Sequence, residues 1–388
     1  MKVRPIVWMN VALTLPAAIS LYAGFRNALL RSQDLQWSGA NLVLQHIDPY
    51  RQFLRHDPEH RIVLSQVPNY LHELYILLLP LGALSFSHAK PVWAILNCLF
   101  AVLIAFILRR IYDLRRSHAL LILLLLFSST PFRIVMGNGQ QSLLELLLFC
   151  LIFHFAKPAG QGIALGLSYS KYSFSPVVFL YLFFRRRFRV LAISFIAPLF
   201  GLLIMGLLVH SSLFALSTEP LTVSRADSIN GLGNLMTIIQ IAGRNVLSLS
   251  LTQKIMAAAA LLASVTFAFA LSRQKNIFPP RDAAALAIAT LMFFPHRTYD
   301  YVFLAIPLAA ALTAPFQRAK TYIMMTVALL WFGTKLVPTS LPSGAQLIEQ
   351  VAVFLLLSGI LVLLSRNALA FQPDPVQSSI SDEVAEIV

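Results

Sequence analysis

Residues 91–108 read PVWAILNCLFAVLIAFIL and carry no charged side chain. As an α-helix this stretch would be about 27 Å long, close to the hydrocarbon thickness of a bilayer. Apolar runs of similar length recur along the chain. Inside a membrane every backbone polar group needs an internal partner, and these runs lack the alternation of β-barrel strands. The pattern therefore predicts an all-α, polytopic membrane protein.

The composition agrees with this class. Of the 388 residues, 58% are hydrophobic and 12% are charged, whereas soluble domains carry about 25% charged residues. The net charge is +14, and the basic residues are scattered over short polar segments. This is typical of cytoplasmic loops and of contact with anionic membrane lipids, and it argues against a nucleic-acid partner. Cys98 and Cys150 lie within apolar runs, so we expect free thiols.

Apolar runs and loop charges together predict about twelve crossings with both ends in the cytoplasm. Lys2 and Arg4 precede an uncleaved first span, and RRRFR (185–189) marks a cytoplasmic loop. The segment 234–251 contains Arg244 and is expected to be re-entrant or interfacial. The predicted spans cover about residues 6–25, 71–87, 91–108, 119–135, 142–156, 162–184, 190–209, 254–272, 283–295, 301–316, 320–337 and 346–364.

One basic loop conflicts with this arrangement. Strict alternation places RRIYDLRR (109–116) outside. Either a neighbouring span is a broken half-helix, or the positive-inside rule is overridden here. The rest forms one integral membrane domain, 1–366. Residues 367–388 contain acidic but no basic side chains and are predicted to form a disordered cytoplasmic tail.

Three polar segments, 26–70, 210–233 and 293–301, are expected on the side opposite the basic loops. The first is a long extracytoplasmic loop, and its helical spacing allows a short amphipathic helix that would hold Asp34 at the bilayer boundary. A cavity at this level is expected to be lined by Asp34, Asp48, His296, Arg297 and Asp300.

Several segments occur in the order typical of a known family. They are Asp34 with DPY (48–50), PNYLHELYILLLPLGAL (68–84), GNGQQSLLELLL (137–148), GIALGLSYSKYSFSPVVFLYLFFRRRFR (162–189) and PHRTYDYVFLAIPL (295–308). Together they resemble glycosyltransferase family 87, a group of membrane mannosyltransferase-like enzymes of the GT-C superfamily. The resemblance implies a GT-C-type fold, an extracytoplasmic active site and a polyprenyl-phosphate sugar donor. It also implies an aspartate general base, for which the matching residue is Asp34.

Elementary chemistry asks for the same groups. An inverting sugar transfer needs a carboxylate that removes the proton of the acceptor hydroxyl as the donor C1–O bond breaks. The lipid phosphate leaves as an anion, so cations must stabilise its charge. The alternative for Asp34 is a solvated loop acid or a helix N-cap.

Further candidates carry weaker signals. Lys171 lies within an apolar run, where a cation usually faces a polar cavity, and we expect it to bind the donor phosphate. The alternatives are snorkelling to the interface and pairing with an acid such as Glu145. Gln140 lies in GNGQQ (137–141), where a helix break could present backbone amides and this side chain to a polar group.

The late outer motif supplies His296 and Arg297. His296 matches the family histidine and would contact donor phosphate or acceptor, unless it is an ordinary loop histidine. The planar guanidinium of Arg297 suits phosphate oxygens. Tyr50 is a further substrate-binding candidate through the DPY motif, whereas the turn signature favours a structural role for Asp48.

No cofactor is expected. HDPEH (56–60) spaces two histidines four apart, but Pro58 opposes a helix that would present both and no third ligand is near, so we predict no metal site.

The combined prediction is a multi-pass glycosyltransferase in the inner membrane of a bacterium. It would transfer a sugar, mannose by family precedent, from a polyprenyl-phosphate donor to a glycolipid or glycan acceptor. The rival hypotheses are a transporter and a flippase-like protein that binds polyprenyl lipids.

Overall fold

The structure is a computed structural model that describes residues 5–226, 232–244, 246–274, 279–314, 317–333 and 343–365. Every regular element in these ranges is a helix, which confirms the all-α prediction. The predicted tail, 367–388, lies outside the described residues.

The first half of the chain forms many short helices among a few long ones. They are α1 (Pro5–Arg31), α2 (Trp37–Leu44), α3 (Pro49–Leu54), η1 (Val63–Ser65), α4 (His72–Gly82), α5 (Phe86–Ile111), α6 (Arg116–Ser128), α7 (Thr130–Asn138), α8 (Ser142–His154), α9 (Pro158–Ser168), η2 (Tyr169–Lys171), α10 (Pro176–Phe184) and α11 (Phe188–Ser194).

The second half continues this pattern. It contains α12 (Ile196–Val209), α13 (Leu213–Ala226), α14 (Leu235–Gly243), α15 (Leu249–Ser272), α16 (Pro279–Phe293), η3 (Thr298–Leu304), α17 (Ala305–Thr313), α18 (Gln317–Ala328), η4 (Leu329–Gly333) and α19 (Ser343–Ser365).

Five helical segments of the described residues are long and apolar enough to cross a membrane: α1, α5, α11 with α12, α15 and α19. A sixth arises if α6 and α7, which meet at an angle of 61°, form one bent span. The bend has a local cause, because Ser129 is extended, caps the amide of Phe132 and is followed closely by Pro131. These segments support a multi-pass membrane protein.

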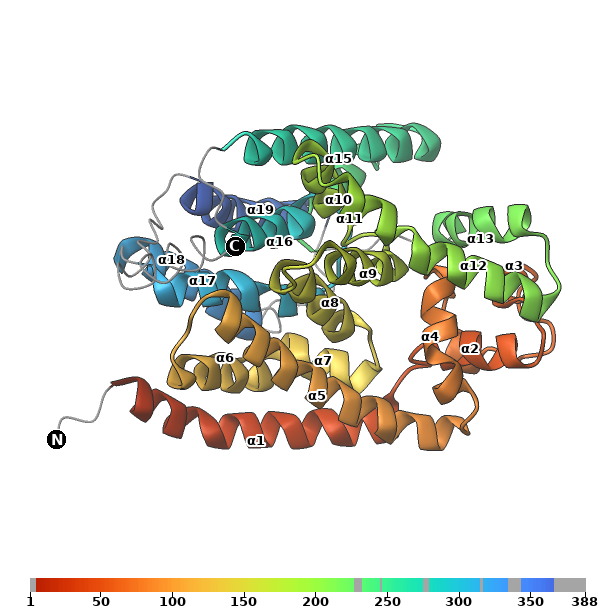
Figure 1. Ribbon diagram of the computed structural model, residues 1–388, viewed down its shortest axis with the longest axis horizontal. Helices are drawn as coiled ribbons and strands as arrows, with labels where there is room; N and C mark the ends of the chain where they lie inside the picture. Colours follow the sequence, from red (N-terminus) through yellow and green to blue (C-terminus); the bar gives the residue numbers. More distant parts are fainter. Residues whose placement is uncertain are drawn as a thin grey trace, which may run out of the picture.

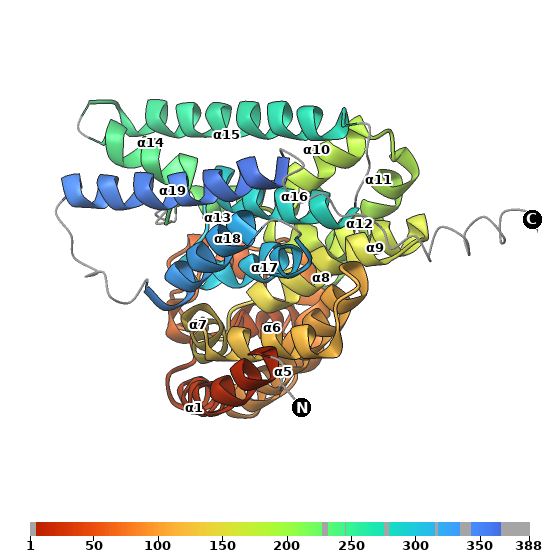
Figure 2. The ribbon, with the colours of Figure 1, turned by 90° about the vertical axis from the view of Figure 1, so that its left-hand side faces the viewer.

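The long helices run in more than one direction. α1 and α5 follow the long axis of the molecule, and α2, α3, α4 and α13 gather at the end away from the N-terminus (Figure 1). α15 and α19 cover one side and α1 the opposite side, with α8, α16 and α17 between them (Figure 2). The core therefore lies between two layers of long helices.

The first helices explain where the basic loop 109–116 lies. Lys90, near the start of α5, donates to the carbonyl of Leu29, near the end of α1. Asn10, in the first turns of α1, donates to the carbonyl of Ser117 at the start of α6. Thus α5 returns along α1, and the loop 109–116 lies at the N-terminal end of α1.

A predicted span is missing between α1 and α5. α4 has only 11 residues, so the continuous spanning helix expected over 71–87 is wrong. The loop 109–116 lies near the basic segment 185–189, because both contact the segment 280–282. Tyr112 donates to the carbonyl of Pro280 at 2.6 Å, and Arg185 lies 3.7 Å from Asp282. The structure therefore favours the broken half-helix over a local exception to the positive-inside rule.

The predicted span over 162–184 is also wrong. α9 ends at Ser168, a short turn follows, and α10 begins at Pro176. Proline at the first position of α10 is suited to a helix start, since its missing amide proton would be unpaired there anyway. The break places Lys171 between two helices rather than inside one.

The segment 234–251 contains the short helix α14 and the first residues of α15, and a re-entrant or interfacial position for it stays a prediction. α14 has nine residues, begins at the capping side chain of Asn234 and packs against α15 and α19. α15 begins at Leu249, capped by Ser248, five residues before the expected start of that span.

Candidate active site

Asp34 lies in the loop between α1 and α2. Leu35 and Gln36 have positive φ values of 47° and 62°, so the chain turns sharply after Asp34. Its side chain is buried, and its Oδ1 accepts a 2.6 Å hydrogen bond from the amide of Ser38 in the first turn of α2. The N-cap position of α2 is Gln36, so Asp34 is neither the N-cap nor the solvated loop acid of the alternative interpretation but a buried acid two residues before the N-cap.

Burial changes the acidity of Asp34. Loss of hydration raises its pKa to about 7, although hydrogen bonding by Ser38 and Trp37 lowers it in part. A carboxyl group with a pKa near neutrality can both take up and release a proton under ordinary conditions. This is the property that a general base requires.

The GNGQQ turn (137–141) contacts the loop that carries Asp34. Gln141 donates through Nε2 to the carbonyl of Leu35 at 3.0 Å, and Trp93 donates to the carbonyl of Gly139. Gly139 has a φ of 72°, and a Cβ there would lie 2.8 Å from the Cβ of Leu35. The segment 137–141 thus lies at the same level as Asp34. Gln140 is buried in this turn, but the side chain that holds the loop is Gln141.

A second polar cluster surrounds Lys171. Its Nζ lies 2.5 Å from Asp300 Oδ1 and 3.2 Å from Ser142 Oγ. Ser142 also donates to Asp300 Oδ1 at 2.5 Å, and the amide of Arg297 donates to the second carboxylate oxygen at 2.9 Å. Lys171 is therefore held in a largely buried ion pair with Asp300, and the partner suggested by sequence, Glu145, is not its direct contact.

Aromatic rings complete the surroundings of this cation. The ammonium group of Lys171 lies 4.7 Å from the ring centre of Phe174 and 5.2 Å from that of Tyr299. Such contacts stabilise a desolvated cation by about 1–2 kcal/mol. They add to the attraction that Asp300 exerts on the ammonium group.

Two buried glutamates lie in the same region and were missed as site residues by sequence reasoning. Glu145 accepts from Ser170 Oγ at 2.6 Å through Oε1, while its Oε2 has no hydrogen-bond partner. Neither carboxyl oxygen of Glu73, in α4, has one. Each is an acid inside an apolar run of the sequence, a signal that predicts a buried polar site but not its partners.

His296 is buried at the start of the late motif. Its Nδ1 lies 3.3 Å from the carbonyl of Phe294, its ring packs edge-on against Tyr301, and its Nε2 has no hydrogen-bond partner. Burial lowers its pKa to about 4, so the ring is neutral at pH 7. A carbonyl oxygen only accepts, hence the proton resides on Nδ1 and Nε2 offers a lone pair. Arg297 is exposed and contributes its backbone amide to Asp300.

The loop before α4 links the two clusters. The amide of Leu71 donates to the carbonyl of Ser170, next to Lys171, at 3.0 Å. Burial above all, and then neighbouring charges that include Asp300, raise the pKa of Tyr70. Tyr75 donates to Gln36, two residues after Asp34, at 3.0 Å. The Asp34 loop and the Lys171 cluster are thus parts of one buried polar region.

Tyr50 has a different environment from the one expected. It is fully buried, its hydroxyl donates to the carbonyl of Tyr70 at 2.7 Å, and its ring packs against His72 and Tyr75. It therefore supports the loop before α4 from within the core.

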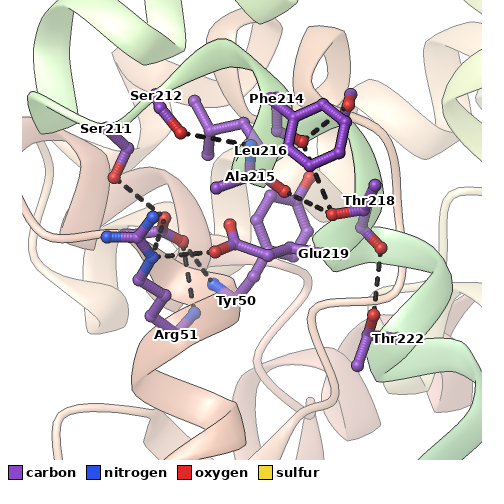
Figure 3. A network of polar contacts seen from close by, with 12 residues as sticks. Tyr50, Arg51, Ser211, Ser212, Phe214, Ala215, Leu216, Thr218, Glu219 and Thr222 are labelled. Atoms are coloured by element: carbon purple, nitrogen blue, oxygen red, sulfur yellow. Dashed lines mark hydrogen bonds and ion pairs between the residues drawn. The ribbon is translucent and has the colours of Figure 1, made fainter.

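Asp48 has the structural role that its turn signature favoured. Its side chain caps α3 by accepting from the amides of Tyr50 and Arg51, and Ser211 donates to it. Arg51 donates through Nε to Glu219 of α13 at 2.8 Å (Figure 3). Asp48 thus belongs to a network that attaches α13 to α3, not to the Asp34 or Lys171 clusters as the predicted cavity lining assumed.

The described residues contain no group of three or more His, Cys, Asp or Glu side chains that could hold a metal ion. The HDPEH segment forms local hydrogen bonds: Asp57 accepts from the amides of Arg61 and Ile62.

Comparison with known proteins identifies the family. No curated protein and no solved structure matches the chain. The model of glycosyltransferase family 87 matches residues 74–314. The matched segment includes Lys171, Glu145 and Asp300, whereas Asp34 precedes it. Because the match covers more than half of the sequence, the chain belongs to glycosyltransferase family 87.

Proposed function

We propose that this glycosyltransferase transfers a sugar, mannose by family precedent, from a polyprenyl-phosphate donor to a lipid or glycan acceptor. The reaction takes place on the extracytoplasmic side of a bacterial inner membrane. The observation that carries this proposal is the buried carboxyl group of Asp34, whose pKa is raised to about 7 on a loop held by Gln141.

Asp34 is the general base of the proposed reaction. Its carboxylate removes the proton of the acceptor hydroxyl while the hydroxyl oxygen attacks C1 of the donor sugar from the face opposite the phosphate. The bond between C1 and the phosphate oxygen breaks, and the lipid phosphate leaves as an anion. A base of this kind contributes about 10²- to 10⁴-fold to the rate.

Lys171 stabilises the negative charge of the leaving phosphate. Its ammonium group is held by Asp300 and Ser142, so the donor would add a phosphate oxygen to a cation that is already oriented. Arg297, which is exposed beside this cluster, supplies a second cation. Gln140 and Tyr50 remain substrate-binding candidates, Tyr50 only through the loop that it supports.

His296 accepts a hydrogen bond from a hydroxyl group rather than binding a phosphate. The lone pair on its Nε2 can accept a hydrogen bond but cannot donate one to a phosphate oxygen, which itself only accepts. We therefore assign it to a hydroxyl of the donor sugar or of the acceptor.

The proposal includes a GT-C-type fold. In this fold the chain crosses the membrane twelve times between the cytoplasmic side, which carries the basic loops, and the side of the candidate active site. α4 is not counted, whereas α9 and α10 are counted separately. This arrangement keeps the loops 109–116 and 185–189 on the cytoplasmic face, as the positive-inside rule requires. Support comes from the contacts of Tyr112 and Arg185 with the segment 280–282.

The test is sugar transfer by the purified full-length protein in lipid, with labelled polyprenyl-phosphate mannose and a crude lipid extract. The Asp34→Asn variant is expected to lose at least about 10²-fold in rate, while Asp113→Asn is the matched control. Asp113 is exposed with a φ of 47°, a conformation that asparagine adopts readily. In the wild type, the rate should rise with pH up to about 7, as Asp34 loses its proton.

Equal rates for Asp34→Asn and the wild type would refute the base assignment. If no donor from a panel of polyprenyl-phosphate sugars yields product, although donor binding is intact, a transporter or flippase-like protein becomes the better account.

A further inference from the structure

A separate pocket lies between the last turn of α1 and α7. Its volume is about 320 Å³. The residues that line it are Asn27, Arg31, Arg133, Ile134, Gly137 and Asn138. None of them belongs to the Lys171 cluster, and Gly137 and Asn138 begin the segment 137–141, which contacts the Asp34 loop.

The pocket carries unbalanced positive charge. No acidic residue lines it, and in the described ranges neither Arg31 nor Arg133 forms an ion pair with a carboxylate. The guanidinium of Arg133 makes only a long hydrogen bond of 3.5 Å to the hydroxyl of Thr130. Two guanidinium groups with free donors beside two asparagine side chains form a site for an anion with several oxygen atoms, and phosphate fits this description best.

The pocket lies at the end of an exposed apolar helix, which indicates a lipid as the source of the anion. α1 is a candidate span that ends at Arg31, and its surface is apolar and exposed over much of its length. Ile19, Tyr22 and Leu30 are 60%, 72% and 68% exposed. A lipid chain that lies along this surface would bring its headgroup to the end of α1, where the two arginines are.

We propose that this pocket binds the phosphate headgroup of an anionic lipid whose chain lies along α1. The claim concerns binding and does not depend on the proposed transfer reaction. The pocket adjoins the Asp34 loop, because Gly139 follows the lining residue Asn138 and packs against Ser32 and Leu35. A bound headgroup would therefore lie beside the loop that carries the proposed base.

The test measures binding of dioctanoyl phosphatidic acid to the full-length protein in detergent by native mass spectrometry. The double variant Arg31→Gln, Arg133→Gln is compared with Arg26→Gln, Arg55→Gln. The control removes the same charge from two exposed positions, one of them also on α1. Loss of charge-assisted hydrogen bonds is expected to weaken binding by at least about tenfold in the pocket variant, with less than about threefold in the control.

Two further arms separate the sources of phosphate and avoid dependence on folding of the variants. Inorganic phosphate should bind the wild type at least about tenfold more weakly than the lipid, since it lacks the chain. A phosphatidic acid with a photoreactive group near its headgroup should label wild-type peptides from 19–31 or 130–138. Equal binding to both double variants, equal affinity for inorganic phosphate, or labelling confined to other helices would each overturn the proposal.

Discussion

The ion pair between Lys171 and Asp300 allows a sharp quantitative test. The side chains of Lys171 and Asp300 are only 13% and 2% exposed, and their charged atoms are 2.5 Å apart. Removal of one partner from a buried pair costs about 3–5 kcal/mol, because the other charge remains without compensation. We therefore expect Lys171→Met and Asp300→Asn each to lower the free energy of unfolding by about this amount.

The double variant distinguishes this pair from two independent contacts. With both charges removed, no unpaired charge remains, so the double variant should cost no more than one single variant, well below the sum of the two. The coupling energy is then at least about 3 kcal/mol. Asparagine at position 300 keeps an oxygen that can accept from Ser142 or from the amide of Arg297, which limits new unpaired donors.

The measurement is reversible unfolding of the purified protein in mixed micelles. A matched cycle on Arg51 and Glu219 is the control, because the side chain of Arg51 is 42% exposed. An exposed pair couples by about 0–1 kcal/mol. A coupling energy for Lys171 and Asp300 no larger than that of the control would refute the argument that burial controls this site. If Lys171 also binds the donor phosphate, the stable double variant should still fail to bind donor.

Three further outcomes follow from the geometry. The pKa of His296 is lowered to about 4 from the usual 6.5. As the pH falls, the unfolded chain therefore binds the proton at a higher pH than the folded chain does. The free energy of unfolding should decrease by about 3 kcal/mol as the pH falls from 6.5 to 4. His296→Gln should lack this loss when unfolding is compared at pH 7 and pH 4, and an identical pH dependence would contradict the burial argument. Gly139→Ala should destabilise the protein by about 1–3 kcal/mol and reduce transfer, because alanine disfavours a φ of 72° and its Cβ meets Leu35. The control is Gly344→Ala, where an added Cβ meets no atom within 4 Å, and it should change the free energy of unfolding by less than about 0.5 kcal/mol. If the two changes had equal effects in thermal unfolding and in transfer assays, a role for the GNGQQ turn would be excluded. A cysteine introduced by Asp113→Cys should react with a membrane-impermeant maleimide only from the cytoplasmic side, and one introduced by Asp57→Cys only from outside; the reverse labelling would overturn the topology.

The candidate site could be predicted in part. Lys171 was identifiable because a lone cation in an apolar run indicates a buried polar site. Its partner was not, since Asp300 lies 129 residues away along the chain and nothing local links the two. The contact between Gln141 and Leu35, which brings the GNGQQ turn to the Asp34 loop, could not be predicted either, because the two residues are 106 positions apart in the chain.

The amino-acid sequence by itself determined the all-α membrane class, because backbone groups in hydrocarbon must be satisfied within helices and the apolar runs are long enough to supply them. It also determined the family through ordered motifs. Only the tertiary structure decided which runs are continuous: 71–87 and 162–184 have the apolarity of spans, yet packing against α2, α12 and the Lys171 turn leaves them as short helices. Hydropathy is a sum over neighbours in the chain, whereas a helix break and an ion pair depend on groups that meet only after folding.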